Sequence, residues 1–207
     1  MFLAAMLATP SGAVMAEAFP PDLFGYRETP RTDIAEFPQW VSALERHLAD
    51  DLRDGDCTEP RLNSCHMREW LRFLAEIRDL PAQVQINKVN EYSNRKDYVL
   101  DLDNYGLFDY WAIPREFLFN GGDCEDYAIT KMMSLRWLGY PAEELRIIVL
   151  QDTNLRIAHA VAAIGTGDDI LILDNQVDEV LSHRNIFHYA PVYSISESRW
   201  WMHLPES

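Results

Sequence analysis

Residues 120–127 read Asn-Gly-Gly-Asp-Cys-Glu-Asp-Tyr, a glycine-rich turn that leads directly into a helical pattern of apolar residues. Over residues 125–138 apolar side chains recur around most of the helical girth, which predicts a buried central helix. Gly139 and Pro141 predict its end, because glycine adopts the left-handed cap conformation and proline cannot continue the helix. The stretch therefore places Cys124 at the start of the helix around which the fold packs.

Helical patterns precede this stretch and strand-like patterns follow it. Apolar residues at helical spacing begin near Pro38 and again at Met67, and a third helical segment covers residues 81–94. Runs of β-branched and aliphatic residues then predict four strands, at residues 145–151, 158–164, 170–174 and 192–195. Helices followed by an antiparallel sheet indicate an α+β fold, in which the helix that carries Cys124 packs on the sheet.

The composition indicates one globular domain. The chain has 207 residues, of which 48% are hydrophobic and 12% aromatic, enough to bury a full core. Its formal net charge of -15 argues against nucleic acid or an anionic membrane as the main partner, because phosphate binding needs a basic surface. We expect a cation or a basic protein segment instead.

The N-terminal segment indicates export. Residues 1–18 carry an apolar stretch and then small residues that suit a signal peptidase, with Val14-Met15-Ala16 and Ala16-Glu17-Ala18 as the two candidate cleavage sites. A basic n-region is absent, so the true start lies upstream or the stretch is simply an apolar N-terminus. It is too short to span a membrane. Residues 19–37 predict an extended, proline-rich arm, which leaves residues 38–207 as a single domain.

The cysteine spacing agrees with export. Cys57 and Cys65 lie in a loop that contains glycine, proline and asparagine, and we expect them to form a local disulfide in an oxidising compartment. Two alternatives remain open: two unpaired cysteines, or a zinc site for which His66 is the one further ligand nearby. Cys124 is left over as an odd thiol.

This odd thiol has the setting of a nucleophile. A thiol attacks only as the thiolate, and a helix N-terminus lowers a thiol pKa through its unpaired N–H groups and the macrodipole. Gly121 and Gly122 allow a tight turn without side chains, which leaves the sulfur of Cys124 approachable and amide donors free for an oxyanion. The alternative is a buried structural cysteine at a helix start.

A histidine and an aspartate follow Cys124 in the strand region, in the order of a catalytic triad. His159 interrupts a small and aliphatic strand, and a neutral imidazole there can take the thiol proton. If residues 165–168 close a hairpin, Asp174 lies directly opposite His159 and can orient its ring. Asn175 is the competing orienting residue, since an amide can do the same, and a satisfied core histidine is the alternative for His159.

Three acids crowd the predicted thiolate: Asp123, Glu125 and Asp126. Nearby carboxylates raise a thiol pKa, so something must neutralise or redirect them. One explanation is helix capping, with Asp123 at the N-cap and the other two acids complementing the dipole. The other is a bound Ca²⁺, with Asp123 and Glu125 as ligands and Asp103 or Asp109 from the preceding loop as further ones. The residues alone leave both explanations open.

Trp111 lies shortly before the turn, within Asp109-Tyr110-Trp111. An indole N–H near a catalytic thiol can donate to an oxyanion, which makes Trp111 a candidate for that role. We favour core packing beside the central helix for both Tyr110 and Trp111.

Four ordered motifs stand out: Asp109-Tyr110-Trp111, residues 121–129, Ala158-His159-Ala160-Val161 and Leu173-Asp174-Asn175. Together they resemble the bacterial transglutaminase-like cysteine proteinases, the LapG-type periplasmic proteases, over roughly residues 35–203. The resemblance implies a papain-like/transglutaminase core and a triad of Cys124, His159 and Asp174. It also implies calcium dependence through Asp123 and Glu125, and we expect no organic cofactor.

For LapG-type members, the resemblance implies cleavage of a large surface adhesin near its N-terminus, which releases biofilm cells. It also implies restraint by an inner-membrane receptor that senses cyclic diguanylate. The leading function is therefore an exported, periplasmic thiol endopeptidase in which Cys124 attacks, His159 transfers the proton and Asp174 holds the imidazole. The alternatives are a transglutaminase, in which an amine intercepts the same thioester, a non-catalytic calcium-dependent binding module, and a zinc site built from the three triad residues.

Overall fold

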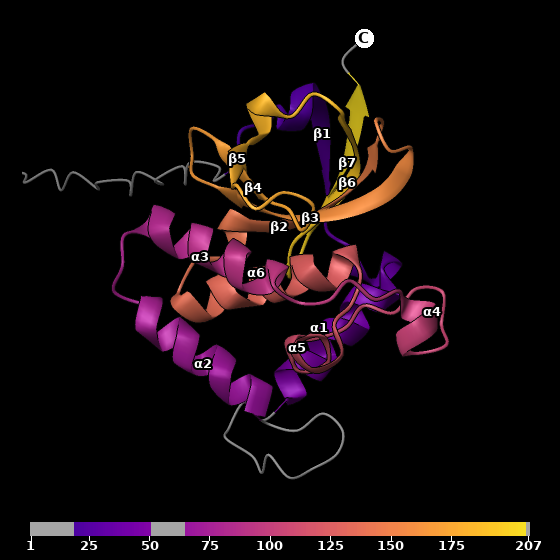
Figure 1. Ribbon diagram of the computed structural model, residues 1–207. Helices are drawn as coiled ribbons and strands as arrows, with labels where there is room; N and C mark the ends of the chain where they lie inside the picture. Colours follow the sequence, from indigo (N-terminus) through magenta and orange to yellow (C-terminus); the bar gives the residue numbers. More distant parts are fainter. Residues whose placement is uncertain (1–18, 51–64, 206–207) are drawn as a thin grey trace, which may run out of the picture.

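The computed structural model describes residues 19–50 and 65–205. Within these ranges a layer of helices covers one face of a seven-stranded antiparallel sheet, which is the α+β arrangement expected from the sequence (Figure 1). The signal segment predicted at residues 1–18 lies outside the described residues. Across the described part of the chain, no helix has the length and apolar character needed to cross a membrane.

The long helices lie where the apolar spacing predicts them. Gly139 ends the central helix in the left-handed conformation, and its amide donates to the carbonyl of Arg136, which confirms the predicted cap. The helices are α1 (Pro38–Ala49), α2 (Cys65–Ile77), α3 (Ala82–Asn94), α4 (Asp101–Asn104), α5 (Pro114–Asn120) and α6 (Cys124–Leu138), with 3-10 turns η1 (Leu23–Gly25), η2 (Ile34–Glu36), η3 (Ala142–Glu144) and η4 (His183–Asn185).

The four predicted strands are present, and three more extend the sheet at its two ends. The strand order is β1-β7-β6-β2-β3-β4-β5. The strands are β1 (Tyr26–Arg31), β2 (Leu145–Asp152), β3 (Ile157–Gly165), β4 (Ile170–Leu173), β5 (Leu181–Ser182), β6 (Tyr189–Ile195) and β7 (Trp200–Pro205). β4 pairs with β3 only over Ala162–Gly165, so the first half of β3 extends past the end of β4.

The sheet separates two apolar cores. On β3, Ala160, Ala162 and Ile164 pack with the helical layer, whereas Val161 and Ala163 belong to a second cluster on the opposite face. This division follows from the two-residue period of a strand, whose side chains alternate between the faces. Because both faces are covered, β3 is apolar almost throughout, and His159 stands out as a polar residue near its start.

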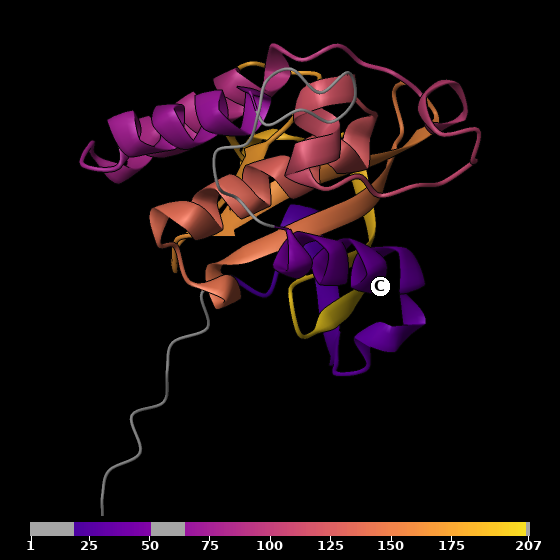
Figure 2. The same ribbon diagram turned by 90° about the horizontal axis from the view of Figure 1, so that it is seen from below.

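α6 is the central element of the helical layer. It lies against β3 and, seen from below, between the pair α2–α3 and α1 (Figures 1 and 2). Residues 126–135 of α6 are all buried, which explains why its sequence is apolar on nearly every side. Because α6 packs on the sheet, its first residue, Cys124, lies beside the part of β3 that extends past the end of β4.

The N-terminal arm is part of the sheet. β1, within the predicted arm at residues 19–37, pairs with β7 along its whole length. Behind this pair, the buried guanidinium of Arg146 lies 3.9 Å from the ring centre of Phe19 and 3.5 Å from that of Trp201, and it pairs with Glu28 at 2.6 Å. Trp201 is therefore a buried residue, and the tail that contains it is the strand β7.

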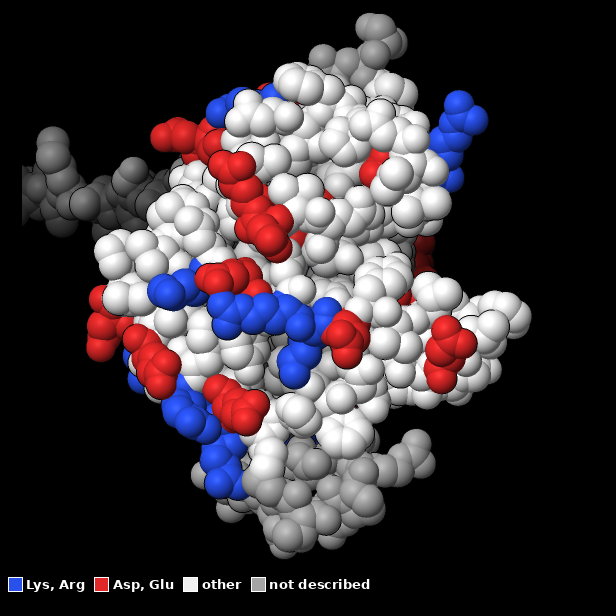
Figure 3. Space-filling model, viewed as in Figure 1, with Lys and Arg blue, Asp and Glu red and all other residues white. Residues whose placement is uncertain are grey.

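The cysteines divide as the sequence predicts in the part that the structure describes. Cys65 is disulfide-bonded and Cys124 is a free thiol. Cys57, the expected partner of Cys65, lies outside the described residues. On the surface, basic side chains over α2 and α3 are interspersed with acidic ones on the face shown in Figure 3.

Candidate active site

The turn before α6 is held by a neighbouring loop segment. Gly122 N donates to Asp97 O at 3.3 Å, and Val99 N donates to Gly122 O at 2.9 Å. A Cβ on Gly121 would lie 2.4 Å from Asp97 O, and one on Gly122 would lie 2.1 Å from a carboxylate oxygen of Asp126. Both positions therefore require glycine, and Gly121 also has a positive φ of 73°.

Asp126 organises the start of α6. Its carboxylate accepts hydrogen bonds from the amide of Asp123, at 3.2 Å, and from the amide of Ala112, at 2.6 Å. Burial raises the pKa of Asp126 well above its ordinary value, and the neighbouring charge of Glu125 raises it further. Capping thus accounts for Asp126, and Asp123 occupies the N-cap position. It does not account for Glu125.

The sulfur of Cys124 is half-buried beside these acids, and its thiol donates to the carboxylate of Glu125 at 3.2 Å. Burial raises the pKa of the thiol, and the charge of Glu125, this hydrogen bond and the charge of Asp123 raise it further. A hydrogen bond with the backbone of Ala160 acts in the opposite direction. Burial and the neighbouring carboxylates therefore keep the pKa of the thiol above its ordinary value, which favours the protonated thiol at neutral pH.

The Ala160 contact also shows where the strand residues lie. Ala160 follows His159 directly, so the start of α6 touches the backbone of β3 at the residue after His159. His159 is 3% exposed, and its Nε2 lies 2.9 Å from Oδ1 of Asp174, which is also 3% exposed. The structure therefore brings the predicted histidine and aspartate into direct contact, one chain position away from the residue that bonds to the sulfur.

The contact is right, but the predicted strand register is wrong. Leu173 pairs with Ala162, so Asp174 would continue opposite Val161, two residues beyond His159. The turn is closed by Thr166 N donating to Asp169 O at 2.9 Å, one residue later than predicted. A shift of two residues keeps every side chain on its face, so His159 and Asp174 meet diagonally.

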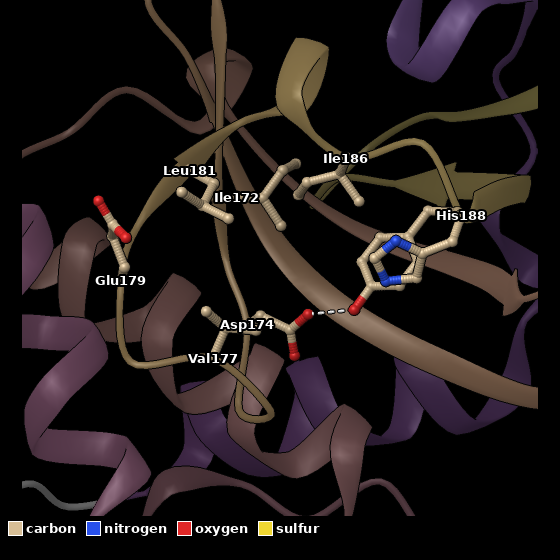
Figure 4. Close-up of a pocket in the computed structure, with 8 residues that line it drawn as sticks. Ile172, Asp174, Val177, Glu179, Leu181, Ile186 and His188 are labelled. Carbon is tan, nitrogen blue, oxygen red and sulfur yellow. Dashed lines mark hydrogen bonds between the residues drawn. The ribbon is translucent and has the colours of Figure 1, made fainter. Parts of the chain in front are cut away.

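Asp174 is held from several directions. Gln176 N donates to Oδ1 at 2.9 Å, and the hydroxyl of Tyr189 donates to Oδ2 (Figure 4). Burial raises the pKa of Asp174, but the bonds from His159, Tyr189 and Gln176 outweigh burial and hold the pKa below its ordinary value. An ionised Asp174 fixes the Nε2 proton on His159, which leaves Nδ1 as the basic nitrogen. Asn175 does not orient His159, because the side-chain oxygen of Asn175 is buried without a hydrogen-bond partner.

Tyr189 is a site residue that the sequence does not reveal. Its ring also packs edge-on against His159, with centroids 5.9 Å apart. It begins β6, and in the sequence it is one aromatic residue among several in a strand-like run. Only the strand order, which places β6 two strands from β3, indicates that Tyr189 lies near the site.

A cluster of carboxylates lies beside the thiol. Two overlapping groups have ligand oxygens within 4.8 Å of one another: Asp101, Asp109 and Glu125, and Asp101, Asp123 and Asp126. Three of the predicted metal ligands are therefore members of these groups, Asp109 and Glu125 of the first and Asp123 of the second. Asp103 is exposed and belongs to neither group, whereas Asp101, two positions earlier, belongs to both.

Two acids of this cluster, Asp101 and Glu125, resist ionisation. Burial raises the pKa of Asp101 to about 6 and that of Glu125 to about 8, with further contributions from neighbouring carboxylates. One oxygen of Asp101 and one of Asp123 are buried without a hydrogen-bond partner. Carboxylates packed in this way can hold a hard cation through oxygen ligands alone. Neither group includes Cys124, His159 or Asp174, which argues against a zinc site made from the triad.

Trp111 does not have the oxyanion-binding role considered for it. Its indole Nε1 donates to Asp109 at 3.0 Å, so this N–H is occupied rather than free for an oxyanion. The ring is 7% exposed and packs against Trp40, with centroids 6.1 Å apart. Trp111 is thus a core residue that also orients one acid of the cluster, in agreement with the packing interpretation.

Comparisons with known proteins agree with this arrangement. A family model described as bacterial transglutaminase-like cysteine proteinase BTLCP matches residues 57–207. The structure of Legionella pneumophila LapG has a TM-score of 0.62 at 28% sequence identity and covers 79% of this chain and 87% of that chain. A calcium-bound form of the same protein has a TM-score of 0.61 at 27% identity, over 79% and 87%, and an EGTA-treated form has 0.62 at 28%, over 79% and 84%. No curated protein matches the chain.

The family match spans most of the described fold and every residue of the site above. The structural likeness covers 79% of this chain and shows a transglutaminase-like fold. Because the matching family is one of cysteine proteinases, the enzyme is a cysteine peptidase. This chain belongs to the family of bacterial transglutaminase-like cysteine proteinases.

Proposed function

We propose that the protein is an exported, calcium-dependent cysteine endopeptidase that cleaves a protein of the bacterial envelope. The observation that carries the proposal is the shared position of two features at the start of α6. Asp123 and Glu125 flank the nucleophile Cys124 and also belong to the acid cluster. A cation bound there acts on the thiol directly, because it changes the charges that control the thiol pKa.

The chemistry needs only groups of this chain and one water molecule. The sulfur of Cys124 attacks the peptide carbonyl carbon, and Nδ1 of His159 takes the thiol proton, while Asp174 holds the imidazolium. Backbone N–H groups at the start of α6 stabilise the oxyanion. The C–N bond then breaks, and the leaving amine takes the proton from His159. Water attacks the thioester, with His159 as base, and frees the acid product and the thiol.

The acid cluster fits Ca²⁺. It offers only oxygen donors, and the buried oxygens of Asp101 and Asp123 without a hydrogen-bond partner are available as ligands. Asp101 would hold the ion together with Asp109 and Glu125, or together with Asp123 and Asp126. Bound Ca²⁺ neutralises the carboxylates that raise the thiol pKa. The calcium-bound form of Legionella pneumophila LapG supports this assignment.

Export and substrate rest on separate observations. The predicted signal segment at residues 1–18 and the disulfide-bonded Cys65 both favour an oxidising compartment, which we take to be the periplasm. The resemblance of the motifs to the LapG-type proteases implies a large surface adhesin as substrate and an inner-membrane receptor for cyclic diguanylate as regulatory partner. The net charge of -15 suits a basic segment in one of these partners.

The test is a comparison of cell-envelope proteins from cells that produce the wild-type protein or Cys124→Ser. We expect a new protein N-terminus that appears only with the wild type and disappears when a calcium chelator is added. Equal N-termini in both strains would overturn the endopeptidase assignment. If a labelled amine instead enters a glutamine of an intact protein, the enzyme is a transglutaminase. Full activity of Cys124→Ala in cells would leave only a binding module.

A further inference from the structure

The segment that carries Asp174 lies beyond the sheet. β4 ends at Leu173, and the last ladder pair joins this residue to Ala162. Residues 176–178 are exposed. Strand pairing therefore does not fix the backbone of the triad acid, although its carboxylate must stay within hydrogen-bond distance of His159 for the imidazole to remain oriented.

Two asparagines on one face of α3 bind this segment instead. Asn94 Nδ2 donates to the carbonyl of Asp174 at 2.9 Å and lies 3.3 Å from a carboxylate oxygen of Asp178. Asn90 Nδ2 donates to the carbonyls of Asp178, at 3.0 Å, and Val177, at 3.3 Å. The two asparagines are four positions apart, which places them on adjacent turns of the same helical face. Asn90 is 0% exposed, so its bonds are made away from water.

Lys131, on the central helix, binds the residue just before Asp174. Its ammonium lies 3.5 Å from the carbonyl of Leu173, and the residue is 0% exposed. Lys131 belongs to α6, about two turns after Cys124. The helix that carries the nucleophile thus also contacts the backbone that carries the triad acid. A fully buried lysine is costly, and none of the catalytic steps above uses it.

A small cavity explains why this backbone needs holding. A space of about 40 Å³ adjoins Asp174 and is lined mainly by apolar side chains. Figure 4 shows Asp174 and Val177 at one side of it and Ile172, Leu181 and Ile186 at the other. Such a space holds a water molecule or two, so close packing does not confine the segment that carries Asp174 on this side.

We infer that Asn90, Asn94 and Lys131 are positioning residues that hold the backbone of Asp174 and thereby keep its carboxylate on His159. The expected effect on catalysis rests on the proposed function. The claim that these residues hold the backbone rests on the hydrogen bonds alone. Between them the three side chains bind four carbonyls, those of Leu173, Asp174, Val177 and Asp178.

The kinetic test compares Asn94→Ala and Lys131→Met with Asn87→Ala. Asn87 is an exposed asparagine of the same helix, bonded to Gln83, and serves as the matched control. We expect both test variants to lower kcat by about 10- to 100-fold with KM nearly unchanged, because a small misplacement of a catalytic group costs rate and not substrate binding. Asn87→Ala should keep the wild-type kcat. A wild-type kcat in both test variants would overturn the inference.

A spectroscopic test needs no substrate. The proton on Nε2 of His159, bonded to Asp174, should give a low-field proton resonance in the wild-type protein. We expect this resonance to move upfield or broaden in Asn94→Ala and Lys131→Met and to stay in place in Asn87→Ala. An unchanged resonance in both test variants would contradict the inference. If the wild type cleaves no protein, the proposed function fails, and this resonance alone decides whether the three residues position Asp174.

Discussion

At the scale of single residues, Asp174 depends on Tyr189 as well as on His159. The Tyr189 hydroxyl donates to the carboxylate oxygen that His159 does not use, and this bond helps to lower the pKa of Asp174. A hydrogen bond to a charged group contributes about 1.5–3 kcal/mol. Without it the carboxylate is both less fixed and easier to protonate.

We therefore expect Tyr189→Phe to lower kcat/KM by about tenfold, since that factor corresponds to ~1.4 kcal/mol of lost stabilisation. The loss should be largest at the acid end of the pH profile, because Asp174 with a higher pKa loses its charge first there. Tyr92→Phe, in a stacked pair with Phe73 on the helical side, is the matched control. A wild-type profile for Tyr189→Phe would show that His159 needs no such support.

Lys131 gives a prediction for stability against pH. Burial lowers its pKa to about 7, although the charges of Asp174 and Asp178 act to raise it. A lysine in the unfolded chain titrates near about 10.4, so between the two values the unfolded chain binds more protons and the folded protein gains stability as pH rises. Below the folded pKa, the full cost of the buried charge is present.

Lys131→Met removes that cost. We expect the variant to have a higher Tm than the wild type at pH 6 and to lose most of this advantage at pH 10, as measured by calorimetry. A greater advantage at pH 10 than at pH 6 would contradict the assignment of a buried charge. Higher stability together with lower kcat would separate the positioning role from a purely structural one.

At the scale of elements, α4 and the loop from α4 to α5 supply acids to a site at the start of α6. Asp101 belongs to both carboxylate groups, and Asp103, on the same short helix, belongs to neither. We expect millimolar calcium to raise the Tm of the wild-type protein, because a ligand that binds only the folded state stabilises it. Asp101→Asn should lose this rise and Asp103→Asn should keep it. An equal rise in Asp101→Asn would exclude the cluster as the calcium site.

The elements of the site were largely predictable from the sequence. The helix that starts at Cys124 and the strands that carry His159 and Asp174 follow from local apolar patterns, which report burial directly. The register between β3 and β4 was not predictable, because it depends on which residue closes the turn. Asp101 was missed because Asp103 looks the same in the sequence, and only the fold distinguishes a buried carboxylate from an exposed one.

At the scale of the whole molecule, the contacts that the sequence does not predict are those between segments far apart in the chain. β1 pairs with β7 across almost the entire chain, and Tyr189 reaches Asp174 from a different strand. Such contacts leave no local pattern, since each strand alone is short and partly polar. The family resemblance supplied the core and the triad but not these contacts.

The buried ion pair behind β1 tests whether the arm is part of the fold. Arg146 is 2% exposed and lies between two aromatic rings. Glu28→Gln removes the buried carboxylate that pairs with this guanidinium, so we expect the free energy of unfolding to fall by about 3 kcal/mol in urea titrations. Glu36→Gln, at an exposed position shortly after β1, should change it by less than about 0.5 kcal/mol. Equal effects would mean that the arm contributes little to stability.

The mechanism requires that His159 take the proton of the Cys124 thiol. The most direct measurement is the rate at which iodoacetamide labels Cys124 at pH 6.5 in the presence of calcium, compared between the wild type and His159→Ala. The imidazole takes the thiol proton, so we predict that labelling is about 100-fold slower in His159→Ala, with the difference vanishing above the thiol pKa. Equal labelling rates at pH 6.5 would contradict the account, because the sulfur would then react without the histidine.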